Sequence, residues 1–510
     1  MAENPYNIVI IRPPMVVSKG TISSRTLSLF LPLGIAYLAA YIRERGFKVS
    51  VIDAFGEAPV DRTVYNDFDI IGLTIESIIE RLPSNVDVIG LSCTFSNDWP
   101  YARELMLNVR KAYSAAVLVI GGEHPRALPE YTLEDCQALD YLIYGEGEEP
   151  FYQLLKCLIS GEQVQSIPGV VYREKNGISE IIPSKRIKEV DDLPLPAWDL
   201  LPVENFLSRG LCYLPNPSRR FMPVSTSRGC PYTCKFCTAA GMWGKQYNQR
   251  SPEKVFSEIK LHKDRYGLNG FDISDLTFMG NRNWIVRFFE LLISEKLELE
   301  WCMISTRSEL IDEELARLLK KSGCIMVSVT PDSGSKKQLK EMQKRVDLNH
   351  IKMVVRALIK EDINIRVNLV FAFPNETHWS ILQTFYYGFK LAWAGAQSIF
   401  FIKFVPYPGS EYFELCRARG QIPQIGQAFD HFLTSNVTGE LKEVHSYSPY
   451  VSDKAVKRYI YLGTILSQMI FMMRHPWRFL KVLWKGCRNQ SDEPIAQAFV
   501  ASLSRLGIKF

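Results

Sequence analysis

Three cysteines lie close together in one short stretch, and their type and spacing make them the first candidates for a functional site. Residues 227–237 read SRGCPYTCKFC, which places Cys230, Cys234 and Cys237 within eight positions. Such a triplet could belong to a disulfide, a zinc site or an iron–sulfur site. The other cysteines stand singly, as small buried apolar residues usually do: Cys93, Cys136, Cys157, Cys212, Cys302, Cys324, Cys416 and Cys487.

The surrounding chain favours the iron–sulfur alternative. The first residues, MAENPYNIVIIRPP, lack the features of a secretory signal, so we expect a cytoplasmic protein whose thiols stay reduced. Zinc sites usually add a second ligand pair, but none follows here and His262 stands alone on a basic helix. Three thiolates can instead hold three irons of a cubane cluster and leave the fourth iron open to substrate. Phe236 would then keep water off the cluster and offer a face to a purine.

The cysteine loop, which directly follows a predicted strand, resembles the radical S-adenosylmethionine (SAM) superfamily. This resemblance implies that Cys230, Cys234 and Cys237 bind a 4Fe-4S cluster whose open iron chelates the amino and carboxylate groups of SAM. Reductive cleavage of SAM would yield a 5'-deoxyadenosyl radical, which takes hydrogen atoms from C–H bonds. The resemblance also implies an electron donor such as flavodoxin or ferredoxin.

Further segments resemble the parts of these enzymes that surround SAM. ISDLTF, STRSEL and VTPDSGS match an acidic strand end, the next strand–helix unit and a segment that commonly reads E-S-G-S. For each matched residue, ordinary barrel packing is the alternative interpretation. The resemblance predicts a SAM-binding set of Phe236, Asp275, Arg307, Asp332 and Ser333.

One later segment departs from the family pattern. FAFPNET has Ala372 and Asn375 where relatives usually have glycine. Glycine permits close backbone approach, so the departure weakens the case for contact between this loop and SAM. PYPGS, at residues 406–410, closes the barrel as it does in relatives.

The first 160 residues resemble the cobalamin-binding domain that precedes many radical SAM barrels. The segments VIGLSCTF, VIGGEHPRALPE and DYLIYGEGEEPFYQLL carry this resemblance. Their loops would share the carboxyl edge of a parallel sheet, where ligands bind, although single glycines there could simply form tight turns. The predicted cobalamin-binding residues are Ser92, Cys93, Thr94, Gly121, Gly122, Glu123, His124, Gly145, Glu146 and Gly147.

If cobalamin binds as the resemblance implies, the lower face of its cobalt would lack a histidine from the usual loop. In the wider cobalamin-binding fold, a D-x-H-x-x-G loop after the first strand supplies a histidine, and IRPPMVVSKG contains none. Weak or absent lower coordination suits methyl transfer. His124 is an alternative ligand, but we interpret it as a residue that lines the nucleotide tail.

The predicted strands and helices that carry these residues alternate along the chain. Residues 1–160 predict a Rossmann-like, doubly wound sheet, and residues 161–218 a hairpin around Asn176-Gly177 with a proline-rich linker. Residues 219–425 contain about six βα units, which predicts a partial (β/α)6 TIM-type barrel with its chemistry at the carboxyl ends of the strands. Residues 426–510 predict a helical region.

These features together predict a cobalamin-dependent radical SAM enzyme. The expected reaction is methylation of an unactivated carbon in a small-molecule substrate, either a natural product or a lipid-like compound, through methylcobalamin and the deoxyadenosyl radical. The first alternative is a radical SAM cyclase, oxidase or rearrangement enzyme without net methyl transfer. The second is a non-catalytic cobalamin or cluster sensor, which the intact triplet and the full barrel disfavour.

Composition and charge limit the partners. Hydrophobic residues make up 47% and charged residues 23%, which is typical of a globular chain. Residues 451–510 carry ten Lys and Arg against three Asp and Glu, within a chain of net charge +5. This basic tail could meet an anionic substrate, a partner or a membrane surface as a peripheral contact, whereas nothing indicates nucleic acid. The most apolar segment, LGTILSQMIFMM, is shorter than the roughly 20 residues that span a bilayer.

Overall fold

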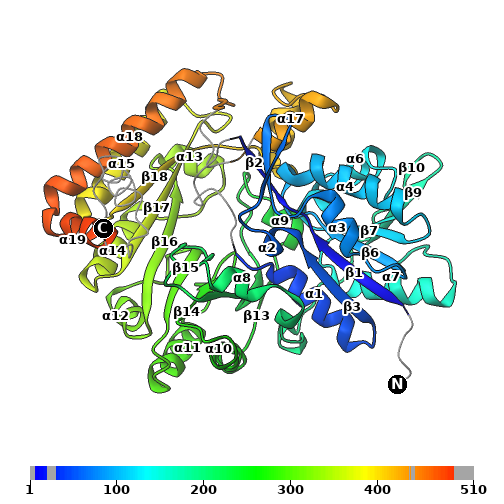
Figure 1. The fold of residues 1–510 in the computed structure, drawn as a ribbon. Helices are drawn as coiled ribbons and strands as arrows, with labels where there is room; N and C mark the ends of the chain where they lie inside the picture. Colours follow the sequence, from blue (N-terminus) through cyan, green and yellow to red (C-terminus); the bar gives the residue numbers. More distant parts are fainter. Residues whose placement is uncertain (1–5, 20–29, 436, 438–442, 488–510) are drawn as a thin grey trace.

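A seven-stranded sheet forms the N-terminal part of the computed structural model, which describes residues 6–19, 30–435, 437 and 443–487 (Figure 1). Its strands are β1 (Asn7–Arg12), β3 (Lys48–Asp53), β6 (Val88–Ser92), β7 (Val117–Gly121), β8 (Tyr141–Ile143), β9 (Val170–Glu174) and β10 (Gly177–Ile178). The order across the sheet is β10-β9-β8-β7-β6-β1-β3; the pairs from β8 to β3 are parallel, and the β8–β9 and β9–β10 pairs are antiparallel. The chain reverses its winding between β1 and β6, so the ligand crevice of a doubly wound sheet is expected there. The predicted Rossmann-like architecture is confirmed.

Both faces of this sheet are covered by helices. In β1, Ile8 and Ile10 pack in one apolar cluster, and the alternate residues Val9 and Ile11 pack in another on the opposite face. A strand buried on both sides reads as a continuous apolar run, as NIVII does. The helices of this domain are α1 (Leu33–Glu44), α2 (Ala54–Glu57), α3 (Ile75–Arg81), α4 (Trp99–Ala112), α5 (Glu123–Ala127), α6 (Pro129–Asp135) and α7 (Glu148–Ser160), together with the 3-10 turn η2 (Ser96–Asp98).

A small three-stranded sheet, which the sequence pattern did not predict, lies next to the first domain's crevice. It consists of β2 (Met15–Ser18), β4 (Arg62–Tyr65) and β5 (Phe68–Ile71), paired antiparallel in the order β2-β5-β4. Strand β4 is largely exposed, so it lacks the buried face that gives a strand its apolar alternation. The linker that follows the first domain contains η3 (Val190–Asp192), η4 (Trp198–Leu200) and α8 (Val203–Leu207).

Six parallel strands in sequential order form the second sheet. They are β11 (Phe221–Val224), β14 (Gly270–Ile273), β15 (Glu300–Thr306), β16 (Cys324–Asp332), β17 (Asn364–Phe371) and β18 (Ser398–Lys403). Burial along β17 alternates strictly, and Ile365, Val367, Leu369 and Phe371 pack in the apolar cluster beneath the helices. The predicted six-stranded partial barrel is confirmed.

The barrel helices connect these strands, and a hairpin carries the cysteines. The helices are α10 (Pro252–Tyr266), α11 (Arg282–Ser294), α12 (Glu313–Lys321), α13 (Lys336–Glu341), α14 (Leu348–Lys360), α15 (His378–Ala394) and α16 (Glu411–Ala418). After β11 the chain forms β12 (Ser227–Gly229), the cysteine loop, α9 (Ala239–Trp243) and β13 (Tyr247–Gln249). Strands β12 and β13 pair antiparallel, so the hairpin holds both ends of the loop.

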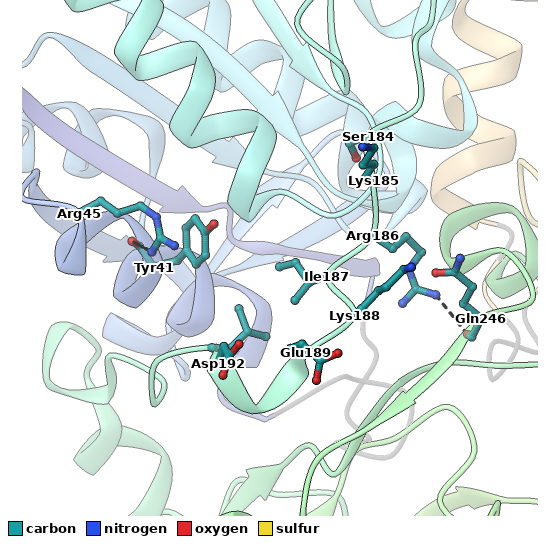
Figure 2. A pocket seen from close by; sticks show the side chains of 11 residues that line it. Tyr41, Arg45, Ser184, Lys185, Arg186, Ile187, Lys188, Glu189, Asp192 and Gln246 are labelled. Atoms are coloured by element: carbon teal, nitrogen blue, oxygen red, sulfur yellow. Dashed lines mark hydrogen bonds between the residues drawn. The ribbon is translucent and has the colours of Figure 1, made fainter.

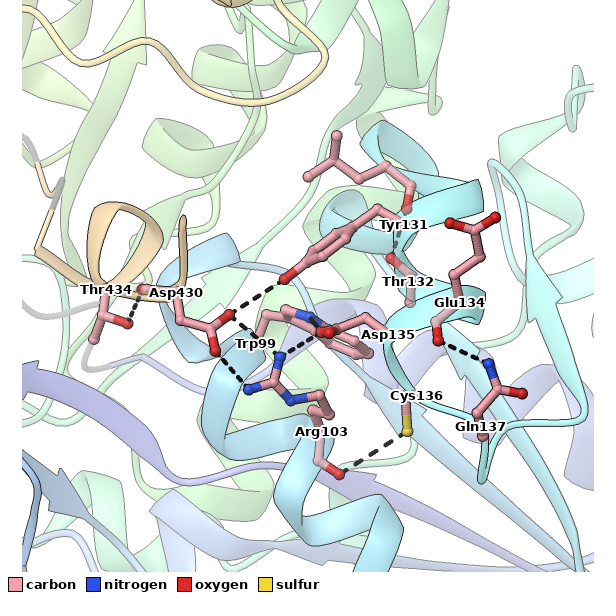
Figure 3. A network of polar contacts seen from close by, with 11 residues as sticks. Trp99, Arg103, Tyr131, Thr132, Glu134, Asp135, Cys136, Gln137, Asp430 and Thr434 are labelled. Carbon is pink, nitrogen blue, oxygen red and sulfur yellow. Dashed lines mark hydrogen bonds and ion pairs between the residues drawn. The ribbon is translucent and has the colours of Figure 1, made fainter. Parts of the chain in front are cut away.

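The C-terminal region is helical, as predicted, and it contacts both domains. Helix α17 (Gln427–Ser435) packs against α4, η2 and β2, whereas α18 (Asp453–Arg474) packs against α15 and β18 and is followed by α19 (Pro476–Cys487). Figure 3 shows how Asp430 of α17 reaches the first domain: its carboxylate is 2.6 Å from Arg103 and accepts a hydrogen bond from Tyr131 at 3.3 Å. Within the described residues, none of the helices has the length and apolarity needed to cross a membrane.

Candidate active site at the cysteine loop

The cysteine loop presents three free thiols at the carboxyl edge of the barrel. Cys230, Cys234 and Cys237 are all partly buried, and the Cys237 amide donates to the Cys234 carbonyl at 3.0 Å. Burial and the neighbouring thiols raise the pKa of Cys234, and they raise that of Cys237 to about 11. A bound metal reverses this effect because its positive charge favours the thiolates.

The donor set fits an iron–sulfur cluster. In the described part of the chain, no three His, Cys, Asp or Glu side chains are arranged to hold one metal ion. In a cubane cluster each cysteine thiolate binds a different iron. The three cysteine sulfurs therefore stand further apart than three ligands of a single metal ion do. Three soft thiol donors on one loop therefore suit such a cluster.

Gly229 sets the geometry at the start of the loop. Its φ of +93° lies in the left-handed region, and an added Cβ would stand 2.0 Å from the Gln246 carbonyl oxygen. Gly229 pairs with Tyr247 in the β12–β13 hairpin, so the two chains approach too closely for a side chain. Only glycine fits directly before Cys230.

Asp275 anchors the segment that leads into the hairpin. Its carboxylate accepts hydrogen bonds from the Thr226 amide at 2.7 Å, the Ser227 hydroxyl at 2.6 Å and the Thr226 hydroxyl. Burial raises the pKa of Asp275, and the bonds from Ser227 and Thr226 oppose that shift. The structure thus gives Asp275 a positioning contact, and its predicted contact with SAM stays a prediction.

Two cations lie beside the loop, and each is paired with a carboxylate. The Arg307 guanidinium lies 3.5 Å from the centre of the Tyr232 ring and is 2.6 Å from Glu309. The Lys344 ammonium is 2.7 Å from Asp332, and its charge opposes the rise in the pKa of Cys234. The sequence analysis missed Lys344, because QKRVD reads as an ordinary solvated turn.

The other predicted SAM neighbours lie around the same edge. The Phe236 ring is 5.7 Å from that of Phe373, and the Lys344 ammonium is 5.9 Å from the Phe236 ring centre. Asp332 ends β16 with a left-handed φ of +63°. Ser333 is fully buried, and its hydroxyl is 3.1 Å from that of Thr384. Fold and loop geometry thus bring all five predicted residues to the carboxyl ends of the strands, while their roles stay predictions.

Several buried polar atoms near this edge have no partner among the described residues. Ser328 lies between Val327 and Val329, which pack under the helices, so its side chain is on the other face of β16, toward the barrel interior. An unpartnered buried polar group costs about 1–3 kcal/mol, which favours a polar ligand at such positions. The atoms are Gln249 Nε2, Ser274 Oγ, Thr277 Oγ1 and Ser328 Oγ. The sequence analysis missed these residues because serine and threonine carry no positional signal.

In the first domain, two loops predicted to bind cobalamin lie side by side. Ser92 pairs with Gly121 across β6 and β7, and the His124 amide donates to the Cys93 carbonyl at 3.2 Å. Gly122 has a φ of +119°, and an added Cβ would stand 2.4 Å from the Cys93 carbonyl oxygen. Gly122 therefore lets the two loops approach each other.

His124 is a buried side chain inside this domain. Its ring stacks on Trp99 at 4.8 Å, and Nδ1 is 3.0 Å from the Ser96 hydroxyl. Burial lowers the pKa of His124 to about 3, so the ring is neutral, and its Nε2 has no partner among the described residues. A neutral ring with one open nitrogen fits a residue that lines a polar tail, as interpreted from the sequence.

The third loop predicted to bind cobalamin contacts the cysteine hairpin directly. The Arg228 guanidinium is 3.2 Å from Glu146 and 2.6 Å from Glu148. Glu146 also accepts from Arg186 at 3.4 Å and from the Ile187 amide at 3.0 Å. Glu146, which the sequence predicts to bind cobalamin, is thus bonded to other residues of the protein. Its carboxylate takes part in a contact between the two domains.

A second interdomain contact lies just after the cysteines. The Thr238 hydroxyl donates to Glu123 at 3.1 Å, and burial raises the pKa of Glu123. Residues of the first domain thus contact the chain before Cys230 and after Cys237. Nothing in the local sequence around Arg228 or Thr238 indicates this pairing.

A separate cavity of about 700 Å³ lies between α1 and the linker (Figure 2). Its lining combines cationic, acidic and apolar groups: Tyr41, Arg45, residues 184–189, Asp192, Leu193 and Gln246. None of the residues predicted for the cluster, SAM or cobalamin lines it. It is therefore distinct from the edge that carries the cysteines.

Comparison with known proteins finds two family matches along this chain. Residues 24–155 match the B12 binding domain, and residues 224–386 match the radical SAM superfamily. An uncharacterized methyltransferase of Pyrococcus horikoshii is 28% identical over 430 residues, which are 84% of this chain and 87% of that protein. The anaerobic magnesium-protoporphyrin IX monomethyl ester cyclase of Cereibacter sphaeroides is 24% identical over 450 residues, with 85% of this chain and 69% of that protein covered.

A solved structure has the same fold. It is the cobalamin-dependent S-adenosylmethionine radical enzyme OxsB, determined with aqua-cobalamin and S-adenosylmethionine bound. The TM-score is 0.67 at 16% identity, and the match covers 98% of this chain and 75% of that one. The likeness therefore extends over both sheets and the helical C-terminal region.

Proposed function

We propose that this chain, a member of the radical SAM superfamily with an N-terminal B12-binding domain, methylates a carbon of a small-molecule substrate. The two domains imply a 4Fe-4S cluster, SAM and cobalamin as cofactors. When bound, the cluster and SAM supply a radical that removes hydrogen, and cobalamin supplies the methyl group. Methyl transfer is the activity named for the Pyrococcus horikoshii relative, which this chain matches over most of its length.

The single observation that carries this proposal is the direct contact between the two cofactor domains. Arg228 stands two residues before Cys230, and its partners are Glu146, in the loop after β8, and Glu148, the first residue of α7. This loop lies at the carboxyl edge of the first sheet, where doubly wound sheets bind ligands. The arrangement supports a reaction in which both cofactors face one substrate, since positioning of reactants is itself a large part of catalysis.

Residues of this chain have separate roles around the cysteine loop. The three thiolates hold the cluster, and the Lys344 and Arg307 cations offset its negative charge. Asp275 keeps Thr226 and Ser227 in place, which orients the hairpin. The buried hydroxyl groups of Ser274, Thr277 and Ser328 are available to bind polar groups of SAM or substrate.

A second candidate function is a radical SAM cyclase or oxidase with the same cofactors. The match to the Cereibacter sphaeroides cyclase favours it, because that match covers 85% of this chain. The protein contacts described above serve either reaction, since both need a cluster, a cobalamin and a substrate carbon held together. The mass of the product separates them.

Anaerobically reconstituted protein tests the proposal. With reductant, SAM and candidate small molecules, we expect deoxyadenosine and a product heavier than its substrate by one methylene, measured by mass spectrometry. A product that has only lost hydrogens would support the cyclase or oxidase, and a preparation that retains no corrinoid would contradict both.

Two cysteine variants provide a matched control for this experiment. Cys234→Ala should lose both bound iron and SAM cleavage, because it removes a cluster ligand. Cys416→Ala removes a buried single cysteine in α16 and should keep its iron content. Equal iron loss in both variants would contradict the role of the triplet.

A further inference from the structure

Three C-terminal and barrel helices expose an unusually large apolar face. On α18 the exposed large apolar side chains are Tyr461, Leu462, Ile465, Leu466, Met469, Met472 and Met473. On α15 they are Trp379, Leu382, Tyr386 and Trp393, and on α19 they are Trp477, Leu480 and Trp484. Trp477 is 82% exposed, Trp379 70% and Met473 65%. We call these residues the apolar face; contiguous exposed patches of this kind mark interaction sites.

The residues on each helix form a continuous stripe. Val456, Ile460, Gly463, Ser467 and Phe471 of α18 recur every three or four residues and are buried. The exposed apolar residues occupy the opposite side at the same helical spacing. A helix that is apolar on all sides is normally buried on all sides. The outer side of α18 is apolar, but its large side chains are exposed in the described part of the chain.

The stripes of α15 and α18 lie next to each other and run in the same direction. Near their N-terminal ends, His378 Nδ1 is 2.8 Å from the Tyr459 hydroxyl. Near their C-terminal ends, the Arg474 guanidinium lies 5.4 Å from the Trp393 ring centre, and His475 contacts the Trp393 carbonyl at 3.0 Å. Figure 1 shows α15, α18 and α19 together at the outer side of the barrel, away from the N-terminal domain.

The charged residues of these three helices are cationic apart from Asp453 at the start of α18, and Asp362, just after α14, pairs with Arg478 and Lys481 of α19. Residues 454–487 contain seven Lys and Arg and no Asp or Glu, and α15 has no acidic residue. Lys454 and Arg458 continue the exposed stripe of α18 at helical spacing, and the Lys390 ammonium lies over the Tyr386 ring at 4.1 Å. Long cationic side chains at the border of an apolar surface can keep their charged ends in water while their stems cover apolar area.

We propose that the apolar face docks this protein on an anionic lipid surface. Helices that lie in a membrane interface combine a broad apolar side, aromatic residues and flanking Lys or Arg, which is the composition found here. None of the described helices can span a bilayer, so docking leaves the barrel on the membrane surface. Cations near such a surface strengthen binding through attraction to the anionic lipids, and salt screens that attraction.

Sedimentation with lipid vesicles tests this inference on the full chain. We expect the protein to pellet with vesicles of phosphatidylcholine and phosphatidylserine, to pellet less with phosphatidylcholine alone, and to be released by salt. The triple variant Ile465→Ser/Met473→Ser/Trp477→Ser should bind at least about tenfold more weakly, because it removes apolar area that enters the interface. The control Val60→Ser/Val64→Ser/Ile425→Ser removes equally exposed apolar side chains elsewhere and should bind as the unmodified chain does.

The charge contribution has its own pair of variants. Lys454→Gln/Arg458→Gln should weaken binding to phosphatidylserine vesicles by about tenfold or more, since two cations are removed. Lys48→Gln/Lys111→Gln, at exposed positions of the first domain, should not. Because these positions are exposed, thermal unfolding should match that of the unmodified chain in every variant.

Two outcomes would overturn the inference. One is the absence of vesicle binding, or binding that the triple variant and its control share equally. The other is a dimer in sedimentation velocity that the triple variant converts to a monomer, which would assign the face to a second copy. Neither outcome bears on the proposed methyl transfer, which is measured without lipid.

Discussion

Arg228 and Glu148 form a 2.6 Å ion pair that joins the cysteine hairpin to the first turn of α7 in the other domain. Both side chains are nearly buried, with exposures of 10% and 7%. Arg228 also lies over the Tyr37 ring at 5.1 Å, so its guanidinium is fixed on more than one side. The chain that leads into the cysteine loop is thus fixed to the first domain by Arg228, in addition to the Thr238–Glu123 contact that follows the loop.

Arg228→Ala should destabilise the protein strongly. Removal of Arg228 takes away the cation paired with the buried Glu148 and leaves Glu146 with Arg186 alone, and breaking a buried pair costs about 3–5 kcal/mol. The free energy of unfolding in urea measures this loss. Arg43→Ala is the control, because its pair with Asp199 is 42% and 37% exposed and should contribute less than about 1 kcal/mol. A similar loss of unfolding free energy in the two variants would contradict a larger contribution from the Arg228 pair.

Two glycines of the cysteine hairpin should respond differently to alanine. Gly229 and Gly244 both have a left-handed φ, of +93° and +61°, so both substitutions meet the same kind of backbone strain. Gly229→Ala also forces a Cβ to 2.0 Å from the Gln246 carbonyl, whereas nothing lies within 4 Å of a Cβ at Gly244. We expect Gly229→Ala to lower bound iron per protein after reconstitution, and Gly244→Ala to keep it near that of the unmodified chain. Iron analysis with equal loss in both variants would contradict this geometry.

His124→Ala should reduce stability without changing the coordination of cobalt. The ring fills space against Trp99, so its removal leaves a cavity that costs about 2–4 kcal/mol. The electron paramagnetic resonance spectrum of Co(II) in corrinoid-loaded protein should be the same in both chains, with no protein nitrogen bound to cobalt. A nitrogen splitting that disappears in the variant would identify His124 as a ligand. Ser96→Ala, which removes only the hydroxyl partner of Nδ1, controls for the hydrogen bond.

Glu376 should make stability fall as the pH rises toward 8. Burial raises the pKa of Glu376 from 4.5 to about 8, although the Ala372 and Phe373 amides oppose this shift. A carboxyl whose pKa is higher in the folded state contributes stability fully below the unfolded value, and the contribution is lost as pH rises through the folded value. Glu376→Gln should therefore flatten the fall in unfolding free energy between about pH 5 and 8. Glu290→Gln, at an exposed position, should leave the slope unchanged.

The departure of FAFPNET from the family pattern has a structural counterpart. Ala372 has a φ of +73°, in the region that glycine adopts without strain. Its amide donates to Glu376 at 2.7 Å, and this bond closes the loop. Residue 372 therefore keeps the backbone conformation typical of glycine although it is an alanine. The sequence pattern alone does not indicate this.

The sequence alone determined the features that depend on local spacing. The triplet of Cys230, Cys234 and Cys237 is visible because the three cysteines lie within one short loop. The two sheets are predictable because buried parallel strands read as short apolar runs and amphipathic helices repeat apolar residues every three or four positions. The confirmed architecture of a doubly wound sheet followed by six βα units rests on those patterns.

Tertiary structure decided which distant residues meet. Arg228 lies 80 residues from Glu148, and Arg103 lies 327 residues from Asp430, so no periodic pattern links either pair. The small β2-β5-β4 sheet and the position of Lys344 beside the cysteines likewise depend on contacts between remote segments. The physical reason is that a local pattern records which side of an element is buried, whereas the partner on that side is selected only when the whole chain packs.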